Sequence, residues 1–469
     1  MPVVAGVDSS TQSTKVELRD ADTGAVVGRA SAPHPPTTPP RSEQDPESWW
    51  RAFSSSWAAL GSPDVAAIAI AGQQHGMVAL DEIGRVLRPA KLWNDTESAP
   101  DAAWLIAQLE TGAGGWADAC GSVPVASFTI TKLSWLHRSE PDVWKRLDRV
   151  LLPHDWMTYR LSGRCTTDRG DASGTGYWSP ADGGYRWDLL ALVDNDRDWT
   201  TAVPHVLGPL DDAGAWRGAV VAPGTGDNMA AALGLGIGVG DVVVSLGTSG
   251  TVFGVSEHPT ADPSGLVAGF ADASGRYLPL ACTLNATKVT DAVARLLGVN
   301  HAGLEELAGQ APPGARGVVV LPYFDGERTP NRPDATGVVS GLRTSVTREE
   351  LARAALEGVV CGLLDARDAL AALIPTAGVM VLTGGGARSR AFRQILADLA
   401  GRPVVVPDVE ESVATGACVQ AAAVLHQRPL DEVQRAWSLG RGSVVEPGPG
   451  STAAADVRAA YARRRDREA

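Results

Sequence analysis

The stretch "VVAGVDSSTQSTKVELRDADTGAVVGRA", Val3–Ala30, alternates apolar runs with polar reversals. It predicts a strand, a Ser/Thr-rich turn, a second strand, an Asp-Thr-Gly turn and a third strand. A related stretch, "DVVVSLGTSGTVFGVSEHP" at Asp241–Pro259, again predicts a strand, a Gly/Ser/Thr turn and a strand. The chain is therefore expected to contain two domains that each begin with a hairpin, although any two hairpins can look alike on pattern alone.

Between and after these hairpins, β-rich segments alternate with long Ala-rich helical segments, which is typical of an α/β protein. The stretch "GVMVLTGGGARSRAFRQILADLAGRPVVVP", Gly378–Pro407, predicts a strand, a triple-glycine turn, an amphipathic helix and a strand. The glycine-rich stretch Ala222–Asp241 is the expected domain boundary. We therefore expect an N-terminal domain at 1–225, a C-terminal domain at 226–440, and a C-terminal helix and tail at 441–469.

Length and charge exclude several classes of function. The chain has 469 residues, too many for one ordinary hydrophobic core, and a formal net charge of -13. An acidic surface repels nucleic acids and anionic membranes, so neither is an expected partner. The sequence also lacks an apolar run of the roughly 20 residues that a membrane span needs. A cytoplasmic protein that binds a small molecule is the expectation.

The first hairpin turn concentrates groups that suit phosphate. Thr11, Ser13 and neighbouring hydroxyl residues surround a tight reversal, and Lys15 adds a positive charge. Backbone N–H groups and hydroxyls in such a turn can bind phosphate oxygens, while Asp8 at the strand end can hold hydrated Mg²⁺. An ordinary hydrophilic β-turn would have the same composition, and the turn alone does not decide between the two.

Two glycine-containing turns in the second half repeat this pattern. In "SLGTSGT", Ser245–Thr251, Gly247 lets the backbone approach an anion and Thr248 can donate a hydrogen bond. A triple glycine, Gly384, Gly385 and Gly386, follows a predicted strand. It would let an adenine or ribose lie against the backbone, although it lacks the spacing of a dinucleotide-binding or Walker A motif.

A predicted strand at Val65–Ala71 ends in polar residues that a buried strand does not need. Gly72, Gln73, Gln74 and His75 follow the apolar run directly. Ligands of open α/β sheets bind just past the carboxyl ends of strands, so these residues predict the edge of a pocket.

The sequence "GDN" places Asp227 and Asn228 just before an Ala-rich helix. An Asp or Asn in this place is most often a helix cap. The alternative is that Asp227 is a carboxylate at a domain junction that accepts a proton from a substrate hydroxyl as its oxygen attacks phosphorus. The motif alone leaves both interpretations open.

Taken together in their order, these motifs resemble a known family. The Asp8 hairpin turn is followed by "GQQHG", "LWND", "TTDRGDASGT", "GDN", "SLGTSGT", "YFDGERTP", "GVVSGL…EELARAALEG" and "LTGGGARSRAFRQILADLAG". Their order resembles that of the FGGY carbohydrate kinases from Val3 to about Gln427, and within that family the sequence is most similar to the xylulokinases. The resemblance implies the actin-like ATPase fold, with two ribonuclease-H-like domains and ATP and sugar in the cleft between them.

The resemblance also implies roles for residues already singled out. Asp227 would be the catalytic base, and the sugar would contact Gln74, His75 and Asn228, with Trp93 as a stacking candidate. Asp8 would assist Mg²⁺. The ATP phosphates and adenosine would contact Thr11, Ser13, Lys15, Gly247, Thr248, Gly384, Gly385 and Gly386.

Two positions depart from the pattern of the xylulokinases. Gln74 stands where many of them carry Met, and Glu97 follows "WNDT" where an Arg is usual. The implied reaction is ATP-dependent phosphorylation of a ketopentose, D-xylulose, at its terminal hydroxyl. The alternatives are a kinase for another ketose or polyol, such as ribulose, gluconate or glycerol, and a non-catalytic sugar-sensing relative. A homodimer is a further, open expectation.

Overall fold

The structure, a computed structural model, describes residues 2–467, which form two compact units. Unit 1 contains the chain through Ile237 together with Glu257–Leu278 and Val409–Gly440. Unit 2 contains Gly238–Ser256, Pro279–Asp408 and the chain from Arg441 onward. Residues 257–278 and 409–440, which the sequence placed in a second linear domain, thus pack in unit 1. In the second of these segments, the helix Ser412–His426 packs on the strands Val3–Ser9 and Ala67–Gly72 of unit 1.

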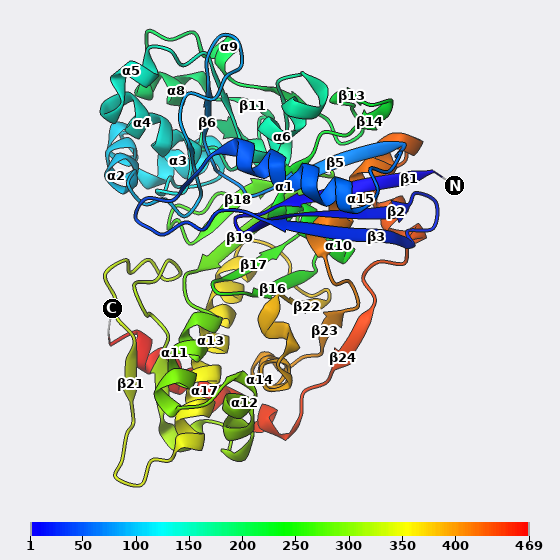
Figure 1. The fold of residues 1–469 in the computed structure, drawn as a ribbon. Helices are drawn as coiled ribbons and strands as arrows, with labels where there is room; N and C mark the ends of the chain where they lie inside the picture. Colours follow the sequence, from blue (N-terminus) through cyan, green and yellow to red (C-terminus); the bar gives the residue numbers. More distant parts are fainter. Residues whose placement is uncertain (1, 468–469) are drawn as a thin grey trace. The chain divides into compact units, whose positions relative to one another are not determined.

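Unit 1 is built on a mixed sheet with the strand order β13-β14-β5-β1-β2-β3, in which β15 also pairs with β5 (Figure 1). The predicted first hairpin and third strand are confirmed, because β1 pairs antiparallel with β2 and β2 with β3. β5 and β15 run parallel to β1. The sheet strands are β1 (Val3–Ser9), β2 (Ser13–Asp20), β3 (Val26–Pro33), β5 (Ala67–Gly72), β13 (Gly214–Trp216), β14 (Ala219–Val221) and β15 (Thr225–Gly226).

Helices and short strands complete unit 1. Its helices are α1 (Pro46–Ala59), α2 (Ala99–Gln108), α3 (Ala113–Cys120), α4 (Thr129–Ser139), α5 (Pro141–Trp144), α6 (Pro153–Ser162), α7 (Arg169–Ala172), α8 (Trp187–Val193), α9 (Trp199–Ala202), α10 (Asp227–Leu235), α15 (Ser412–His426) and α16 (Leu430–Ala436). Its short strands are β4 (Glu43–Gln44), β6 (Val78–Leu80), β7 (Ala90–Lys91), β8 (Arg149–Leu151), β9 (Thr166–Asp168), β10 (Trp178–Ser179), β11 (Gly184–Tyr185), β12 (His205–Leu207) and β18 (Val267–Ala271).

Two helices cover opposite faces of the β1 region of the sheet. Ala5 and Val7 of β1 join the apolar core that includes Trp49 of α1. Because side chains alternate along a strand, Gly6 faces the other way, where α15 lies against it (Figure 1). A Cβ at Gly6 would lie 2.6 Å from the backbone nitrogen of Cys418 in α15. This close approach requires glycine.

Helix α15 also carries α10, the helix that begins with Asp227. The two helices cross where Gly234 of α10 meets Gly416 of α15, and a Cβ at Gly416 would overlap the carbonyl oxygen of Ala230. The backbones can approach this closely only because both positions are glycine. The start of α10 is therefore held against the sheet through α15.

Unit 2 contains a second sheet with the order β19-β17-β16-β22-β23-β24. The second predicted hairpin is confirmed by β16 and β17, and the predicted strand, helix and strand of 378–407 by β22, α14 and β23. The strands are β16 (Val242–Leu246), β17 (Gly250–Gly254), β19 (Tyr277–Thr283), β20 (Val319–Leu321), β21 (Val338–Ser340), β22 (Met380–Thr383), β23 (Val404–Pro407) and β24 (Gly442–Val445). The helices are α11 (Thr287–Leu297), α12 (His301–Gln310), α13 (Arg348–Ala371), α14 (Arg390–Ala400) and α17 (Ala454–Arg465), with short 3-10 turns at Ala315–Gly317, Gly385–Arg388 and Pro449–Ala453.

We predict that Gly416→Val lowers the free energy of unfolding by about 1–3 kcal/mol or more, since its side chain must push α10 away from α15. Turnover should fall as well, because Asp227 moves with α10. Calorimetric unfolding and steady-state kinetics measure the two effects. The matched control is Gly309→Ala, because a Cβ at that helical glycine has no neighbour within 4 Å among the described residues. It should unfold at the wild-type temperature or above. Equal stability of the two variants would contradict the close-packing argument.

Candidate active site

The register of three parallel strands brings polar residues of unit 1 together. Along one row of the sheet, Asp8 of β1 pairs with Ala71 of β5, which pairs with Thr225 of β15. In the next row Ser9, Gly72 and Gly226 are neighbours. The carboxyl ends of the three strands therefore lie side by side, and the segments that follow them meet at one edge. These segments carry the predicted phosphate turn, the "GQQHG" residues and Asp227.

Asp8 lies at this edge with a side chain that is nearly fully buried. Burial raises its pKa to about 6, Lys15 opposes the rise and Glu411 adds to it. Lys15 Nζ lies 3.8 Å from Asp8 and 2.6 Å from Glu411. Asp8 Oδ1 is buried and makes no hydrogen bond to any residue that the structure describes. A carboxylate oxygen left open in this way is a suitable ligand for a hard divalent cation or for a water bound to one.

Asp227 is the first residue of α10, and Gly226, not Asp227, occupies the N-cap position. Asn228 Nδ2 donates to Asp227 Oδ1 over 2.9 Å. The pKa of Asp227 is raised to about 7, first by burial and then by the negative charges of Asp8 and Asp171. The residue itself is partly accessible to solvent. A carboxyl with a pKa near neutrality, on a residue that solvent partly reaches, is suited to accept a proton at physiological pH.

Gln74 and His75 follow β5 in different environments. The Gln74 side chain is buried, and its Oε1 accepts from Asn228 Nδ2 over 2.8 Å. His75 has a φ of 65°, and its Nδ1–H donates to the carbonyl of Gly174 over 2.7 Å. The ring packs against Phe128 and Phe270, with centroids 4.9 Å and 5.5 Å away. These contacts fix the orientation of the imidazole.

A buried charged cluster supports this edge of the sheet. His154 Nδ1 donates to Asp171 Oδ2 over 2.6 Å, and His154 Nε2 lies 3.3 Å from Asp155 Oδ1. Burial lowers the pKa of His154, but Asp155 and Asp171 raise it further, to about 9. Ligand atoms of the three side chains lie within 4.8 Å of one another. The cluster is therefore an ion-paired support.

None of these three residues has a role predicted from the sequence. Asp171 lies in the "TTDRGDASGT" motif, one of those on which the family resemblance rests, and this motif was the only local indication that Asp171 belongs to a functional site. His154 and Asp155 follow an ordinary helix-start pattern, Leu152-Pro153. Nothing in the local sequence indicates that they pair with Asp171.

The first turn of unit 1 makes contacts of its own. Trp93 Nε1 donates to Thr11 Oγ1 over 2.9 Å, and Thr11 Oγ1 donates to Gln73 Oε1 over 3.1 Å. Ser13 begins β2, and its carbonyl accepts from the backbone and side chain of Ser10. The predicted phosphate residue Thr11 and the predicted sugar-stacking residue Trp93 are thus direct neighbours.

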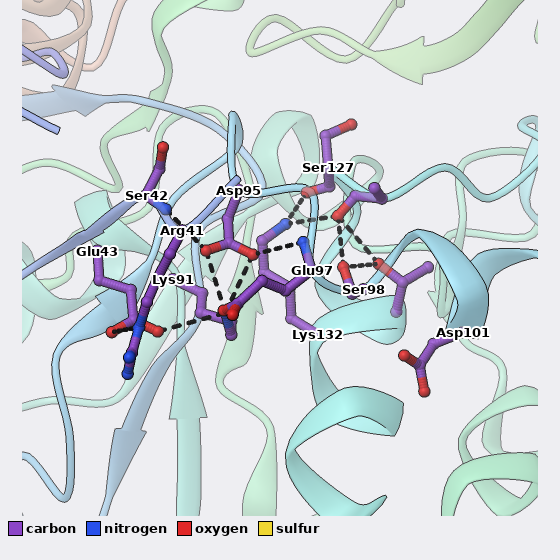
Figure 2. Close-up of polar contacts among 12 residues, drawn as sticks. Arg41, Ser42, Glu43, Lys91, Asp95, Glu97, Ser98, Asp101, Ser127 and Lys132 are labelled. Carbon is purple, nitrogen blue, oxygen red and sulfur yellow. Dashed lines mark hydrogen bonds and ion pairs between the residues drawn. The ribbon is translucent and has the colours of Figure 1, made fainter. Parts of the chain in front are cut away.

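The segment that carries Trp93 is anchored by a buried lysine. Lys91 Nζ is fully buried and lies 3.0 Å from Asp95 Oδ1, 2.5 Å from Glu97 Oε2 and 3.2 Å from Glu43 Oε1 (Figure 2). The ring of Trp135 lies 3.8 Å from the same ammonium group. Glu97, the second departure from the xylulokinase pattern, therefore has a structural partner that is independent of any sugar.

A second buried lysine lies next to this group. Lys132 Nζ donates to the carbonyls of Ala126 and Ser127, and burial lowers its pKa to about 7 while Asp95 opposes that change (Figure 2). These carbonyls belong to the segment that leads into Phe128, the ring that packs on His75. The contacts of the two lysines thus hold in place the segments that carry Trp93 and Phe128.

In unit 2, the two glycine-containing turns also follow neighbouring parallel strands. Ser245 at the end of β16 pairs with Thr383 at the end of β22. Gly384 has a φ of 89°, and a Cβ there would lie 2.7 Å from the carbonyl oxygen of Leu246. The triple glycine therefore packs directly against the start of the Gly247–Thr248 turn. The predicted phosphate turn and the predicted adenosine turn therefore lie next to each other.

The Gly247–Thr248 turn is held by the helix that follows β19. The carbonyl of Gly247 accepts from Thr287 N, and that of Thr248 accepts from Ala286 N, at the start of α11. Glu327 of the "YFDGERTP" motif accepts from Leu284 N and from the Asn285 amide, just before the same helix. The backbone of the turn is thus fixed while the Thr248 residue remains exposed.

The structure therefore gathers the predicted residues into two groups, one in each unit. Unit 1 brings together Asp8, Thr11, Lys15, Gln74, His75, Trp93, Asp227 and Asn228. Unit 2 brings together Gly247, Thr248, Gly384, Gly385 and Gly386. Ser13 lies at the start of β2, next to the first group in sequence.

Comparison with known proteins decides the family. The model of the FGGY family of carbohydrate kinases, N-terminal domain, matches residues 3–234, and that of the C-terminal domain matches residues 242–425. The chain belongs to the FGGY family of carbohydrate kinases. As a member of this family it is a phosphotransferase that uses ATP and an alcohol acceptor.

Several relatives of this FGGY kinase cover almost its whole length. The xylulose kinase of Streptomyces rubiginosus is 47% identical, and that of Streptomyces coelicolor is 46% identical, each over 457 residues, 95% of this chain and 92% of the relative. The crystal structure of xylulose kinase from Bifidobacterium adolescentis is 42% identical, with a TM-score of 0.88 over 99% of both chains. The expected actin-like ATPase fold is confirmed by these matches. No helix among residues 2–467 of the FGGY kinase has both the length and the apolar character of a membrane span.

We predict that kcat/KM falls about tenfold per pH unit below an apparent pKa near 7, because Asp227 must lose its proton before it can accept one. Initial rates between pH 5 and 9 at low sugar concentration measure this. A flat profile across pH 6–8 would contradict the assignment.

The same pKa sets the sign of a stability effect. The pKa of Asp227 is about 7 in the folded protein and about 4 in the unfolded chain. Protonation of Asp227 therefore stabilises the folded state at low pH, and this contribution is lost as the pH rises through about 7. Asp227→Asn should therefore raise the free energy of unfolding more at pH 8 than at pH 5. Denaturant unfolding at the two pH values is the control.

We also predict that Glu97→Arg lowers the free energy of unfolding, on the order of 1–3 kcal/mol, because it removes one carboxylate from buried Lys91 and adds a like charge. Glu97→Gln, which keeps the size, should have a smaller effect. Thermal unfolding separates the two. Wild-type stability of Glu97→Arg with an altered sugar preference would instead place Glu97 at the sugar.

Proposed function

We propose that this chain phosphorylates D-xylulose at its terminal hydroxyl with ATP, giving D-xylulose 5-phosphate. The observation that carries the proposal is the Asp227 carboxyl, whose pKa is raised to about 7, at the meeting point of three strand ends. The choice of sugar is supported by the relatives named xylulose kinase, which are 46% and 47% identical over 95% of the chain.

In the proposed reaction the terminal hydroxyl oxygen of the sugar attacks the γ-phosphorus of ATP. The new O–P bond forms as the bond from phosphorus to the ADP oxygen breaks, and the hydroxyl proton moves to Asp227. Phosphoryl transfer needs positioning and charge stabilisation more than covalent help from the protein. Asn228 and His75 would bind sugar hydroxyls, and Trp93 would contact the carbon skeleton.

Asp8 is the residue that fits a divalent cation. Its Oδ1 is buried with no hydrogen-bond partner among the described residues, and its carboxylate chemistry suits Mg²⁺. Mg²⁺ would neutralise charge on the phosphate oxygens. Lys15 is ion-paired with Glu411, so it would bind phosphate only by exchanging that partner. Gly247, Thr248 and the triple glycine of unit 2 would bind the phosphates and adenosine.

Two further expectations accompany this proposal. A kinase that uses the cellular ATP pool fits the cytoplasmic location expected from the acidic sequence, and the homodimer stays a prediction.

We predict that the wild type releases ADP fastest with D-xylulose in a coupled assay that also contains ribulose, gluconate and glycerol. Asp227→Ala should cut turnover roughly 10²- to 10⁴-fold, the usual contribution of a positioned general base, while ATP binding measured by calorimetry is retained. A preference for another substrate would reassign the sugar but keep the kinase. Full turnover in Asp227→Ala would overturn the assignment of the base, and no turnover with any sugar would favour a non-catalytic relative.

A further inference from the structure

Gln74 makes a contact that a sugar-binding residue does not require. Its side chain is only 4% exposed, and Oε1 accepts from Asn228 Nδ2 over 2.8 Å. The same Nδ2 donates to Asp227 Oδ1 over 2.9 Å. An amide nitrogen has two N–H donors, and here one is directed to Gln74 and the other to Asp227. Gln74 therefore fixes the rotation of the Asn228 amide.

The other end of Gln74 faces the buried charged cluster. Gln74 Nε2 and Asp171 Oδ1 are both buried, and neither has a hydrogen-bond partner among the described residues. The pKa of Asp171 is raised by burial, and hydrogen bonding from His154 and from Gln74 opposes that rise. Gln74 is thus near enough to Asp171 to affect its pKa, and each of the two side chains has a buried polar atom that no described residue bonds.

Packing leaves Gln74 little freedom to leave this position. A Cβ at Gly226, the residue before Asp227, would lie 2.7 Å from Gln74 Cγ. The cluster behind it is equally confined, because a Cβ at Gly72 or Gly224 would lie 2.9 Å or 2.6 Å from His154. The two glycines let His154 pack against β5 and the segment before β15. Gln74 and His154 are thus both closely packed against glycine backbone.

We propose that Gln74 is a positioning residue that couples the Asp227–Asn228 pair to the buried His154–Asp171 pair, and that it does not itself bind the sugar. This inference rests on the proposed function, because it takes Asp227 as the base. With both N–H groups of Asn228 directed toward protein acceptors, the Asn228 oxygen points away from them, toward where a substrate hydroxyl would be recognised. The amide of Gln74 thus orients the base and a substrate acceptor together.

The decisive experiment exchanges the two polar groups. Gln74→Glu places a carboxylate next to Asp171, and Asp171→Asn leaves His154 with a weaker acceptor. Each single variant should lower kcat roughly 10- to 100-fold, since misplacement of a reacting group by about 1 Å has an effect of this size. The KM for the sugar should change less than about threefold.

In the double variant Gln74→Glu/Asp171→Asn, the amide and the carboxylate have changed places. The carboxylate at position 74 can accept from Asn228 and from the new amide at position 171, which can in turn accept from His154. We expect kcat of the double variant to exceed that of both single variants. Gln74→Met, which removes both polar ends at similar volume, should lower kcat and should not be rescued by Asp171→Asn.

Gln394→Met is the matched control, because it removes an amide that bonds Asp398 and the carbonyl of Glu446 in unit 2. It should keep the wild-type kcat and KM. Thermal unfolding of every variant confirms that the compared proteins are folded.

A rise in sugar KM with unchanged kcat in Gln74→Met would overturn the proposal and restore Gln74 as a sugar contact. Additive losses in the double variant would also overturn it. These outcomes leave the proposed function intact provided that Asp227→Ala is inactive. A wild type that turns over no sugar would instead overturn both.

Discussion

The parallel register of β1, β5 and β15 is the constraint on which the rest of the site depends. Because Asp8, Ala71 and Thr225 lie in one row, the residues one or two positions later must emerge at the same edge. Backbone hydrogen bonds set this arrangement, so it does not depend on any single polar side chain. A slip of one residue in β5 would exchange the faces of its side chains and separate Gln74 from Asn228.

Crowding of carboxylates is the electrostatic consequence of that register. Asp8 and Asp171 lie near enough to Asp227 that their negative charges, together with burial, raise its pKa. Lys15 partly offsets the charge of Asp8, and His154 that of Asp171. Lys15 and His154 thus pair with the other two carboxylates, and the pKa of Asp227 stays near 7. A helix-cap residue would not need these surroundings.

The hairpins, the Gly378–Pro407 unit and the order of the motifs were predictable from sequence, because strand alternation and glycine turns are local properties. The partners of the site residues were not. Lys15 pairs with Glu411 and Gln74 with Asn228, residues far along the chain whose proximity arises only from the tertiary fold. For the same reason Gln74 was assigned to the sugar and Glu97 was noted only as a departure from the pattern, while the structure gives each a protein partner. The predicted linear boundaries likewise placed residues 409–440 in the wrong domain, because nothing in the local sequence of a helix indicates which sheet it packs on.

The return of α15 to unit 1 has a consequence for synthesis of the chain. Gly6 of β1 and Gly234 of α10 are both covered by a helix that is made some 180 residues after α10. In a nascent chain that has left the ribosome only as far as α10, the face of the sheet that α15 later covers would be exposed to solvent. The first half of the polypeptide therefore cannot complete its core as it is made. Its folding must wait for the last quarter of the sequence, and the order of assembly differs from the order of translation.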